Sequence, residues 1–302
     1  MRKIALLTTI LLVLTLTACT STATTDKLSN NSEASAGKTT MMTETSASEI
    51  SYETSVAATD APTGSAISTA DVTFEFDLEF ETYPAPETYV TVYGELFRRG
   101  TVIIPSNPDA QDQINATMSE VYDRHSADFA AIKDLAMAAF ADQGEALFNE
   151  SFHFATNASF QGTIINDRLI SFDLYRTTTT EKDIFHSRIE EYTFDVATGK
   201  LLTLDDLFTD IEAVKPILFE KFLVDAGDED VTYSGDLETL LPEKFDNSSW
   251  SFYSNDNGIH FSIIYQQDDI SADNEACIDF SIAVKDLAPY LTDYAKTLFP
   301  EA

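Results

Sequence analysis

Residues 71–80 read DVTFEFDLEF, and every second residue in this stretch is apolar. Successive side chains of a β-strand point to opposite faces, so this period gathers the apolar side chains on one face and the polar ones on the other. The apolar face is made by Val72, Phe74, Phe76, Leu78 and Phe80. A half-buried strand is therefore predicted at the start of the folded part of the chain.

The apolar period lengthens after residue 108. From Ile114 to Phe140, apolar residues recur at steps of three and four, which is the spacing of one face of an α-helix. We expect this helix to be interrupted near His125 and to end at Gly144.

Later segments repeat both patterns in groups. Strand patterns are found at 88–97, 100–104, 152–160, 162–166, 168–176, 189–196, 200–204, 250–266 and 277–284. Helical patterns are found at 203–222, with a break or a fresh start at Pro216, and at 236–245 and 286–299. Clusters of strands with helices between them are typical of α+β proteins. We therefore predict an α+β fold, in which a small α/β subdomain at 71–165 is followed by a mixed or antiparallel sheet with flanking helices at 166–302.

The first nineteen residues have the features of an export signal. Arg2 and Lys3 precede an apolar run from Ile4 to Ala18, which is shorter than the roughly 20 residues that a membrane-spanning helix needs. The motif LTAC resembles the lipobox of bacterial lipoproteins and ends at Cys19. We therefore predict a signal peptide at 1–18 and a lipid anchor on Cys19, which places the protein on the extracytoplasmic face of the cytoplasmic membrane, facing the cell wall. The alternative is an ordinary secretory peptide whose cysteine is incidental.

Residues 19–70 are predicted to form a disordered tether. Of the 51 residues from Thr20 to Ala70, 22 are Ser or Thr, and no apolar period runs through them. Such a segment buries too little apolar surface to offset the entropy lost on ordering. A coil of this length spans roughly 40 Å, so it would hold the folded part away from the membrane.

The chain is strongly acidic, with 51 Asp and Glu against 18 Lys and Arg and a formal net charge of −33. Removal of Arg2 and Lys3 with the signal would take this charge to −35. Nucleic acids and anionic lipid surfaces are poor partners for such a field, whereas cationic proteins and metal ions are attracted to it. The alternative is that the acidity serves only solubility or reflects a salty habitat.

The segment from Tyr192 to Phe208 carries the pattern Y-x-F-D-x-x-T-G-K-x-L-T-L-D-D-L-F. With the later stretches FYSNDNGIHFSIIYQ and IDFSIAVKDLAPYL, it resembles the extracytoplasmic module shared by the anti-sigma factor RsiV and the non-catalytic part of the peptidoglycan deacetylase PdaC. The resemblance extends over residues 73–299. A Gly-Gly-Ala-His segment that is common in that family is missing here, because residues 177–188 read TTTTEKDIFHSR.

The resemblance implies a binding module without catalytic residues or a cofactor of its own. In RsiV the module is a receptor for lysozyme, so lysozyme or another cationic protein is the expected partner, and the negative charge of the chain suits it. The alternatives are a module that binds peptidoglycan or another glycan, and an accessory domain of a cell-wall hydrolase or deacetylase.

The residues that carry chemistry are scattered along the chain. The histidines have no metal-ligand spacing and are His125, His153, His186 and His260. Two acidic clusters have oxygen ligands suited to Ca²⁺ but lack the EF-hand spacing, and they comprise Asp225, Asp228, Glu229, Asp230 and Asp236, and Asp268, Asp269, Asp273 and Glu275. Asp205 and Asp206 are expected to begin a helix, Trp250 to pack in the core rather than line a glycan groove, and Cys277 to be structural.

Overall fold

The computed structural model describes residues 68–83, 92–144, 154–181, 184–226, 232–267, 269–270 and 277–300. The described residues all belong to one compact unit of the chain. The predicted signal peptide and Cys19 lie outside the described residues, as does most of the predicted tether.

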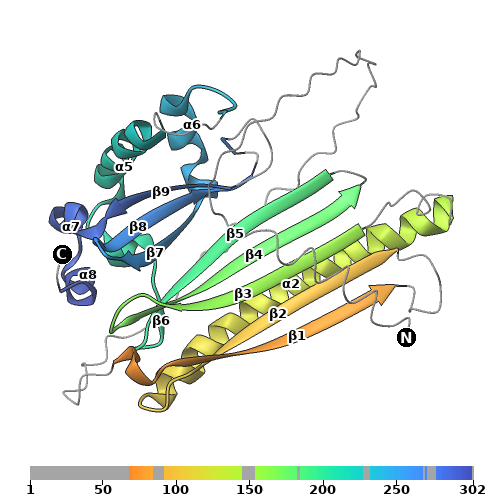
Figure 1. Ribbon diagram of the computed structural model, residues 1–302, viewed down its shortest axis with the longest axis horizontal. Helices are drawn as coiled ribbons and strands as arrows, with labels where there is room; N and C mark the ends of the chain where they lie inside the picture. The colour runs from red at the N-terminus through yellow and green to blue at the C-terminus, as the bar shows by residue number, and fades with distance from the viewer. Residues whose placement is uncertain are drawn as a thin grey trace. The chain divides into compact units, whose positions relative to one another are not determined.

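Two sheets organise the described residues (Figure 1). The first sheet has the strand order β1-β2-β3-β4-β5-β6, formed by Thr73–Tyr83, Tyr93–Ile103, Phe154–Ile164, Leu169–Glu181, Ile184–Asp195 and Lys200–Leu201. Its neighbours are antiparallel except β2 and β3, which are parallel and are connected through the long helix α2, Pro108–Gln143. The second sheet is antiparallel and has the order β7-β8-β9, formed by Ser249–Asn255, Gly258–Tyr265 and Ile278–Ala283.

Shorter helices accompany the second sheet. They are α4 Leu204–Leu207, α5 Ile211–Ala226, α6 Leu237–Lys244, α7 Val284–Leu287 and α8 Asp293–Leu298, and 3₁₀ turns lie at Thr69–Asp71, Phe245–Asn247 and Ala288–Tyr290. The predicted α+β class is confirmed, because the strands form one mixed and one antiparallel sheet with helices beside them. The predicted boundary at residue 165 falls in the turn between β3 and β4, so the first sheet continues across it.

Helix α2 packs along one face of the first sheet. Pro108 occupies its first turn, the Asn107 side chain accepts from the Ala110 N–H at 3.4 Å, and Gly144 ends the helix with a φ of 65°. The interruption expected near His125 is wrong. His125 is only 1% exposed and packs edge-on to Phe160 in the core, where a regular helix positions it.

Each sheet has its own apolar core. The core under α2 includes Phe97, Val102, Ile114, Met118, Phe129, Phe160, Ile170, Phe172, Leu174 and Phe194. The core of the second sheet includes Val214, Leu218, Phe222, Phe261, Ile263, Tyr265, Ile278, Phe280, Ile282 and Leu298. The alternating burial of β9 leaves Asp279 on the polar side, as the period of two requires.

Two glycines that the sequence suggested as strand ends lie inside strands. The segments 88–97 and 100–104 were expected to be separate strands, but β2 runs through Gly100, and β3 likewise runs through Gly162. A Cβ atom would lie 2.9 Å from the Phe76 ring at Gly100 and 2.2 Å from the Phe74 ring at Gly162. Glycine is needed there because aromatic rings cross the backbone closely.

Two predicted helices are divided where the chain bends. The helix expected at 203–222 breaks at residues 208–210, where Phe208 forms a β-bridge with Leu291, and Pro216 lies inside α5. The helix expected at 286–299 is divided into α7, a 3₁₀ turn containing Pro289, and α8, whose N-cap is Thr292. Both breaks place α4 beside α8, and the Thr292 N–H donates to the Leu207 carbonyl at 2.9 Å.

A buried carboxylate accounts for the Asp of the Y-x-F-D-x-x-T-G-K pattern. Asp195 is 0% exposed and receives two bonds from Arg168, at 2.6 and 3.3 Å, and one from the Tyr294 hydroxyl of α8 at 2.8 Å. It also accepts from the Ala197 N–H at 2.9 Å, inside the turn before β6. Gly199 has a φ of 74°, and a Cβ there would lie 2.9 Å from the backbone of Ala110 in α2. These residues join the first sheet, α2 and α8.

Replacement of Asp195 tests this role. We expect Asp195→Ala to lower the free energy of unfolding by about 3 kcal/mol, because Arg168 and Tyr294 lose their shared acceptor. Chemical denaturation of the whole chain measures the loss. The matched control is Asp205→Ala, since Asp205 is exposed and should change stability by less than about 0.5 kcal/mol. Equal effects of the two substitutions would contradict the proposed role.

Candidate functional site

The first candidate site is the outer strand of the first sheet. Among the described residues, β1 pairs only with β2, so one of its edges has no strand beside it. We call its alternating exposed carboxylates the acidic edge, and they are Glu75, Asp77, Glu79 and Glu81. Leu78 and Phe80, which lie between them, are 63% and 54% exposed. Of the apolar face that the sequence predicted, Val72 is buried and Phe74 and Phe76 are partly buried, whereas Leu78 and Phe80 are exposed.

Helix α2 extends the acidic surface. Its exposed carboxylates are Asp109, Asp112, Glu120, Asp123, Asp128, Asp134 and Asp142. The Lys133 ammonium pairs with Glu81, and Arg99 pairs with Glu79 at 3.3 Å while it donates to Ser126 of α2 at 3.3 Å. These contacts bring the C-terminal half of α2 next to the acidic edge.

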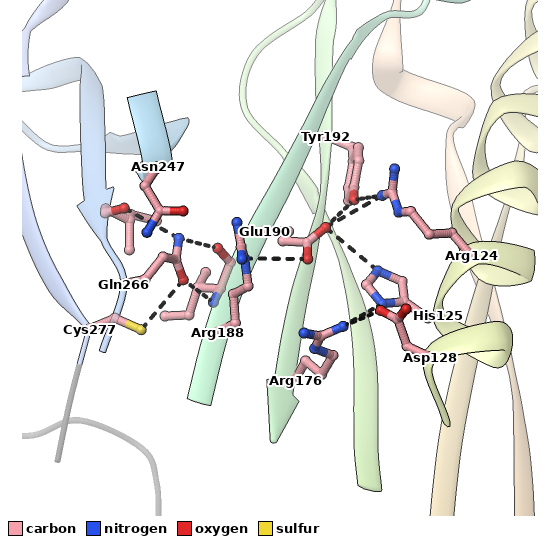
Figure 2. A network of polar contacts seen from close by, with 12 residues as sticks. Arg124, His125, Asp128, Arg176, Arg188, Glu190, Tyr192, Asn247, Gln266 and Cys277 are labelled. Carbon is pink, nitrogen blue, oxygen red and sulfur yellow. Dashed lines mark hydrogen bonds and ion pairs between the residues drawn. The ribbon is translucent and has the colours of Figure 1, made fainter. Parts of the chain in front are cut away.

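A second candidate site is a polar network between α2 and β5, which we call the Glu190 network (Figure 2). The Tyr192 hydroxyl donates to Glu190 Oε2 at 2.5 Å, and Arg124 Nη2 lies 3.5 Å from the same oxygen. His125 Nε2 lies 3.6 Å from Oε2, and Arg188 Nε lies 3.7 Å from Oε1. Four donors from a helix and a strand therefore face one carboxylate.

The network keeps Glu190 ionised. Burial by itself disfavours the charged form, but the His125 ring, the Tyr192 hydroxyl and Arg188 outweigh it and lower the pKa of Glu190 to about 2. Arg124 also receives support from Tyr192, because its Nη2 lies 2.6 Å from the hydroxyl. Glu190 is thus an acceptor across the physiological pH range.

A second ion pair adjoins the network. Arg176 Nη1 lies 2.7 Å from Asp128 Oδ2 and 3.4 Å from His125 Nδ1. A guanidinium can only donate, so in the neutral imidazole this contact requires a lone pair on Nδ1 and leaves the proton on Nε2, facing Glu190. His125 is therefore placed as a bridge between two ion pairs, not as a metal ligand.

The second sheet closes the edge of β5 beyond this network. Gln266 Oε1 accepts from the Ile189 N–H and Gln266 Nε2 donates to the Ile189 carbonyl, each at 2.9 Å, as a neighbouring strand would. Gln267 Oε1 accepts from the Ser187 hydroxyl at 2.7 Å. Figure 2 shows Cys277 beside Gln266, and burial raises the pKa of its thiol, which disfavours the nucleophilic thiolate.

Three carboxyl groups approach one another between the two sheets. Asp173 of β4 and Glu191 of β5 are cross-strand partners, and Asp279 of β9 adds its charge. The Ser171 hydroxyl donates to Asp173 at 2.8 Å and lies 3.5 Å from Glu191, and Ser251 of β7 also bonds to Glu191. Burial, with the charges of Asp173 and Asp279, raises the pKa of Glu191 to about 10, so Glu191 is a proton donor at neutral pH.

Other candidate residues are dispersed. No group of three or more His, Cys, Asp or Glu among the described residues is arranged to hold a metal ion. His186 is exposed on β5 and His260 stacks on Tyr253 at 5.0 Å, while His153 lies outside the described residues. Trp250 packs on Phe252 and Phe261, in agreement with a role in the core.

The two acidic clusters lie largely in parts of the chain that the structure does not describe. Asp236 accepts from the Thr239 hydroxyl at 3.0 Å, and Asp269 accepts from Asn247 at 2.7 and 2.8 Å. Asp206 forms a capping box with Thr203, the N-cap of α4, in agreement with the expected helix start, and Asp205 is exposed beside it.

A cleft of about 700 Å³ opens between two turns of the described fold. The β3–β4 turn contributes Asn166, Asp167 and Arg168, and the β7–β8 turn contributes Asn255 and Asp256. Apolar side chains also line the cleft, among them Ile165, Val284 and Phe299.

None of the described helices is long and apolar enough to span a membrane.

Comparison with known proteins relates the fold to one group of structures. No protein-family model and no curated protein matches the sequence. The chain is similar to a member of the DUF3298 family from Bacteroides fragilis, with a TM-score of 0.54 and 13% identity over 78% of this chain and 99% of that one. It is also similar to a DUF3298 family protein from Pseudomonas aeruginosa PAO1, with a TM-score of 0.47 and 14% identity over 74% of this chain and 96% of that one. The first likeness shows a shared fold and is consistent with the resemblance to the RsiV and PdaC module.

The carboxyl cluster predicts a pH dependence of stability. Between the ordinary pKa of 4.5 and the native value of about 10, folded Glu191 holds a proton that the unfolded chain releases, so stability falls as pH rises through this window. We expect Glu191→Gln to be more stable than the wild type by on the order of 2 kcal/mol near pH 8, and the difference to vanish near pH 4. Parallel profiles of unfolding free energy against pH would show that Glu191 is not held neutral.

Proposed function

We propose that this protein is a lipid-anchored extracytoplasmic module that binds a cationic protein without catalysis. The observation that carries the proposal is the acidic edge, a strand whose outer edge has no partner among the described residues and whose exposed side chains alternate between acidic and apolar. A cationic segment laid along β1 would meet carboxylates at every second position and pack against Leu78 and Phe80.

The negative charge of the acidic edge favours a cationic partner over a second copy of the chain. Two copies of β1 paired edge to edge would bring carboxylates of the same row close together, and like charges across a strand pair are destabilising. A strand or loop rich in Lys and Arg has the complementary pattern, and the net charge of −33 would accelerate its association. The edge is therefore better suited to a cationic partner than to self-association.

Lysozyme is the partner that we propose first. Its support is the resemblance of residues 192–208 to the module of RsiV, which is a lysozyme receptor, together with the acidic surface of β1 and α2. The fold shared with a DUF3298 protein is compatible with this proposal but contributes nothing on function.

The anchor is proposed from the motif LTAC at residues 16–19. We expect the full chain expressed in a bacterium to incorporate labelled fatty acid, and Cys19→Ser to abolish the label and release the protein from the membrane fraction. Label retained by Cys19→Ser would contradict lipidation at this residue. Release of the unmodified chain would instead favour an ordinary secretory peptide.

Neutralising the acidic edge tests the binding site. We expect the mature chain carrying Cys19→Ser to bind hen lysozyme in calorimetric titration at low and near-physiological salt. The variant Glu75→Gln/Asp77→Asn/Glu79→Gln/Glu81→Gln should bind at least about tenfold more weakly, because it keeps the strand but removes its charges.

A matched control separates the site from the net charge. The control variant also removes four exposed carboxylates, but all of them lie after residue 200 and outside β1. It is Asp205→Asn/Glu238→Gln/Asp256→Asn/Asp286→Asn, and it should bind lysozyme as the wild type does. Equal weakening by both variants would reduce the interaction to net charge. Absence of binding by the wild type would overturn the lysozyme proposal. Wall glycans, and the cleft beside the β3–β4 and β7–β8 turns, would then be tested next.

A further inference from the structure

Three arginines gather at one place in this acidic chain. Arg176 of β4 and Arg188 of β5 are directly opposite in the antiparallel ladder, so they point to the same face of the sheet. Arg124 approaches from α2, and Figure 2 shows all three around Glu190. We call them the arginine cluster, and they are three of only seven arginines in the chain.

The cluster breaks a rule of strand pairing. Like charges directly opposite in a ladder destabilise the pair, and a substitution of either arginine by a neutral residue would remove that repulsion. Departures of this kind are expected at functional sites. Among the described residues, the carboxylates of Asp128 and Glu190 face the cluster, and the charge of Asp269 also acts on Arg188.

Some buried N–H donors around Glu190 lie too far from its oxygens to form hydrogen bonds. Among the described residues, the Tyr192 hydroxyl makes the shortest hydrogen bond to Glu190, at 2.5 Å, and Arg124 Nη2 lies 3.5 Å from the same oxygen. Arg188 Nε and His125 Nε2 are buried and make no hydrogen bond, since their distances to Glu190 are 3.7 and 3.6 Å. Buried donors without a hydrogen bond are costly, so a further oxyanion near them would be stabilised.

The cluster is also accessible. The side chains of Arg124 and Arg188 are 44% and 43% exposed, and Arg176 is 21% exposed. Glu190 lies beneath them at 19% exposure and holds Arg124 and Arg188 from its two oxygens. Glu190 thus holds two guanidinium groups of the cluster whose side chains remain partly exposed.

We infer that the arginine cluster binds the carboxylate or phosphate group of a small ligand. Guanidinium groups recognise both oxyanions through paired N–H donors. The negative field of the whole chain opposes polyanions, so the ligand is a small molecule with one such group, or a zwitterion. This inference does not depend on the binding of a cationic protein at the acidic edge, which lies on β1.

The test uses NMR of the mature chain carrying Cys19→Ser, labelled at nitrogen. Inorganic phosphate and N-acetylglycine are titrated separately, with sodium chloride at equal ionic strength as the reference. We expect saturable shifts of the Arg188 and Arg124 Nε–H signals with at least one probe. A response to phosphate alone or to N-acetylglycine alone identifies the oxyanion, and a response to both supports a general oxyanion site.

Two substitutions and a control locate the site. Arg188→Gln and Arg176→Gln should each weaken the titration about tenfold, the effect of losing roughly one charge-assisted bond. Arg98→Gln should leave it unchanged, because Arg98 lies over the Phe76 ring at 4.0 Å and outside the cluster. The inference is overturned if neither probe gives a saturable shift in the wild type, or if Arg98→Gln weakens the titration as much as Arg188→Gln.

Discussion

The buried ion pair between Asp195 and Arg168 is the interaction on which the arrangement of the fold depends. Asp195 is fully buried at the end of β5, and it accepts hydrogen bonds from Arg168 in the β3–β4 turn, from the turn that follows β5 and from Tyr294 of α8. A buried carboxylate is tolerated only when such donors surround it. The pair therefore requires the first sheet and the C-terminal helix to form together, and it accounts for the Asp in the Y-x-F-D pattern as a structural residue.

Negative and positive side chains gather in different parts of the fold. The acidic edge and the outer face of α2 carry carboxylates that face solvent, whereas the arginine cluster lies between α2 and the β4–β5 pair. A third group, around Glu191, holds a neutral carboxyl between the sheets. We propose a cationic partner for the first surface and infer a small anionic ligand for the second, so the two proposals differ in the charge of the ligand.

The fold class followed from the sequence because periods of two and 3.6 are local properties of strands and helices. Strand ends were wrong at Gly100 and Gly162, since the rings that require glycine there come from β1 and β4. The Glu190 network could not be predicted, because Arg124, Arg176 and Arg188 meet only through sheet pairing and helix packing. The acidic edge was visible as alternation, but the solvent exposure of Leu78 and Phe80 depends on β1 being the outer strand.

Binding of a cationic protein along the edge of β1 is tested most directly by amide hydrogen exchange of the mature chain with and without hen lysozyme. We expect slower exchange on binding at the backbone amides of residues 73–83 and little change in β7, β8 and β9. Unchanged exchange in β1, with protection confined to the second sheet, would contradict it.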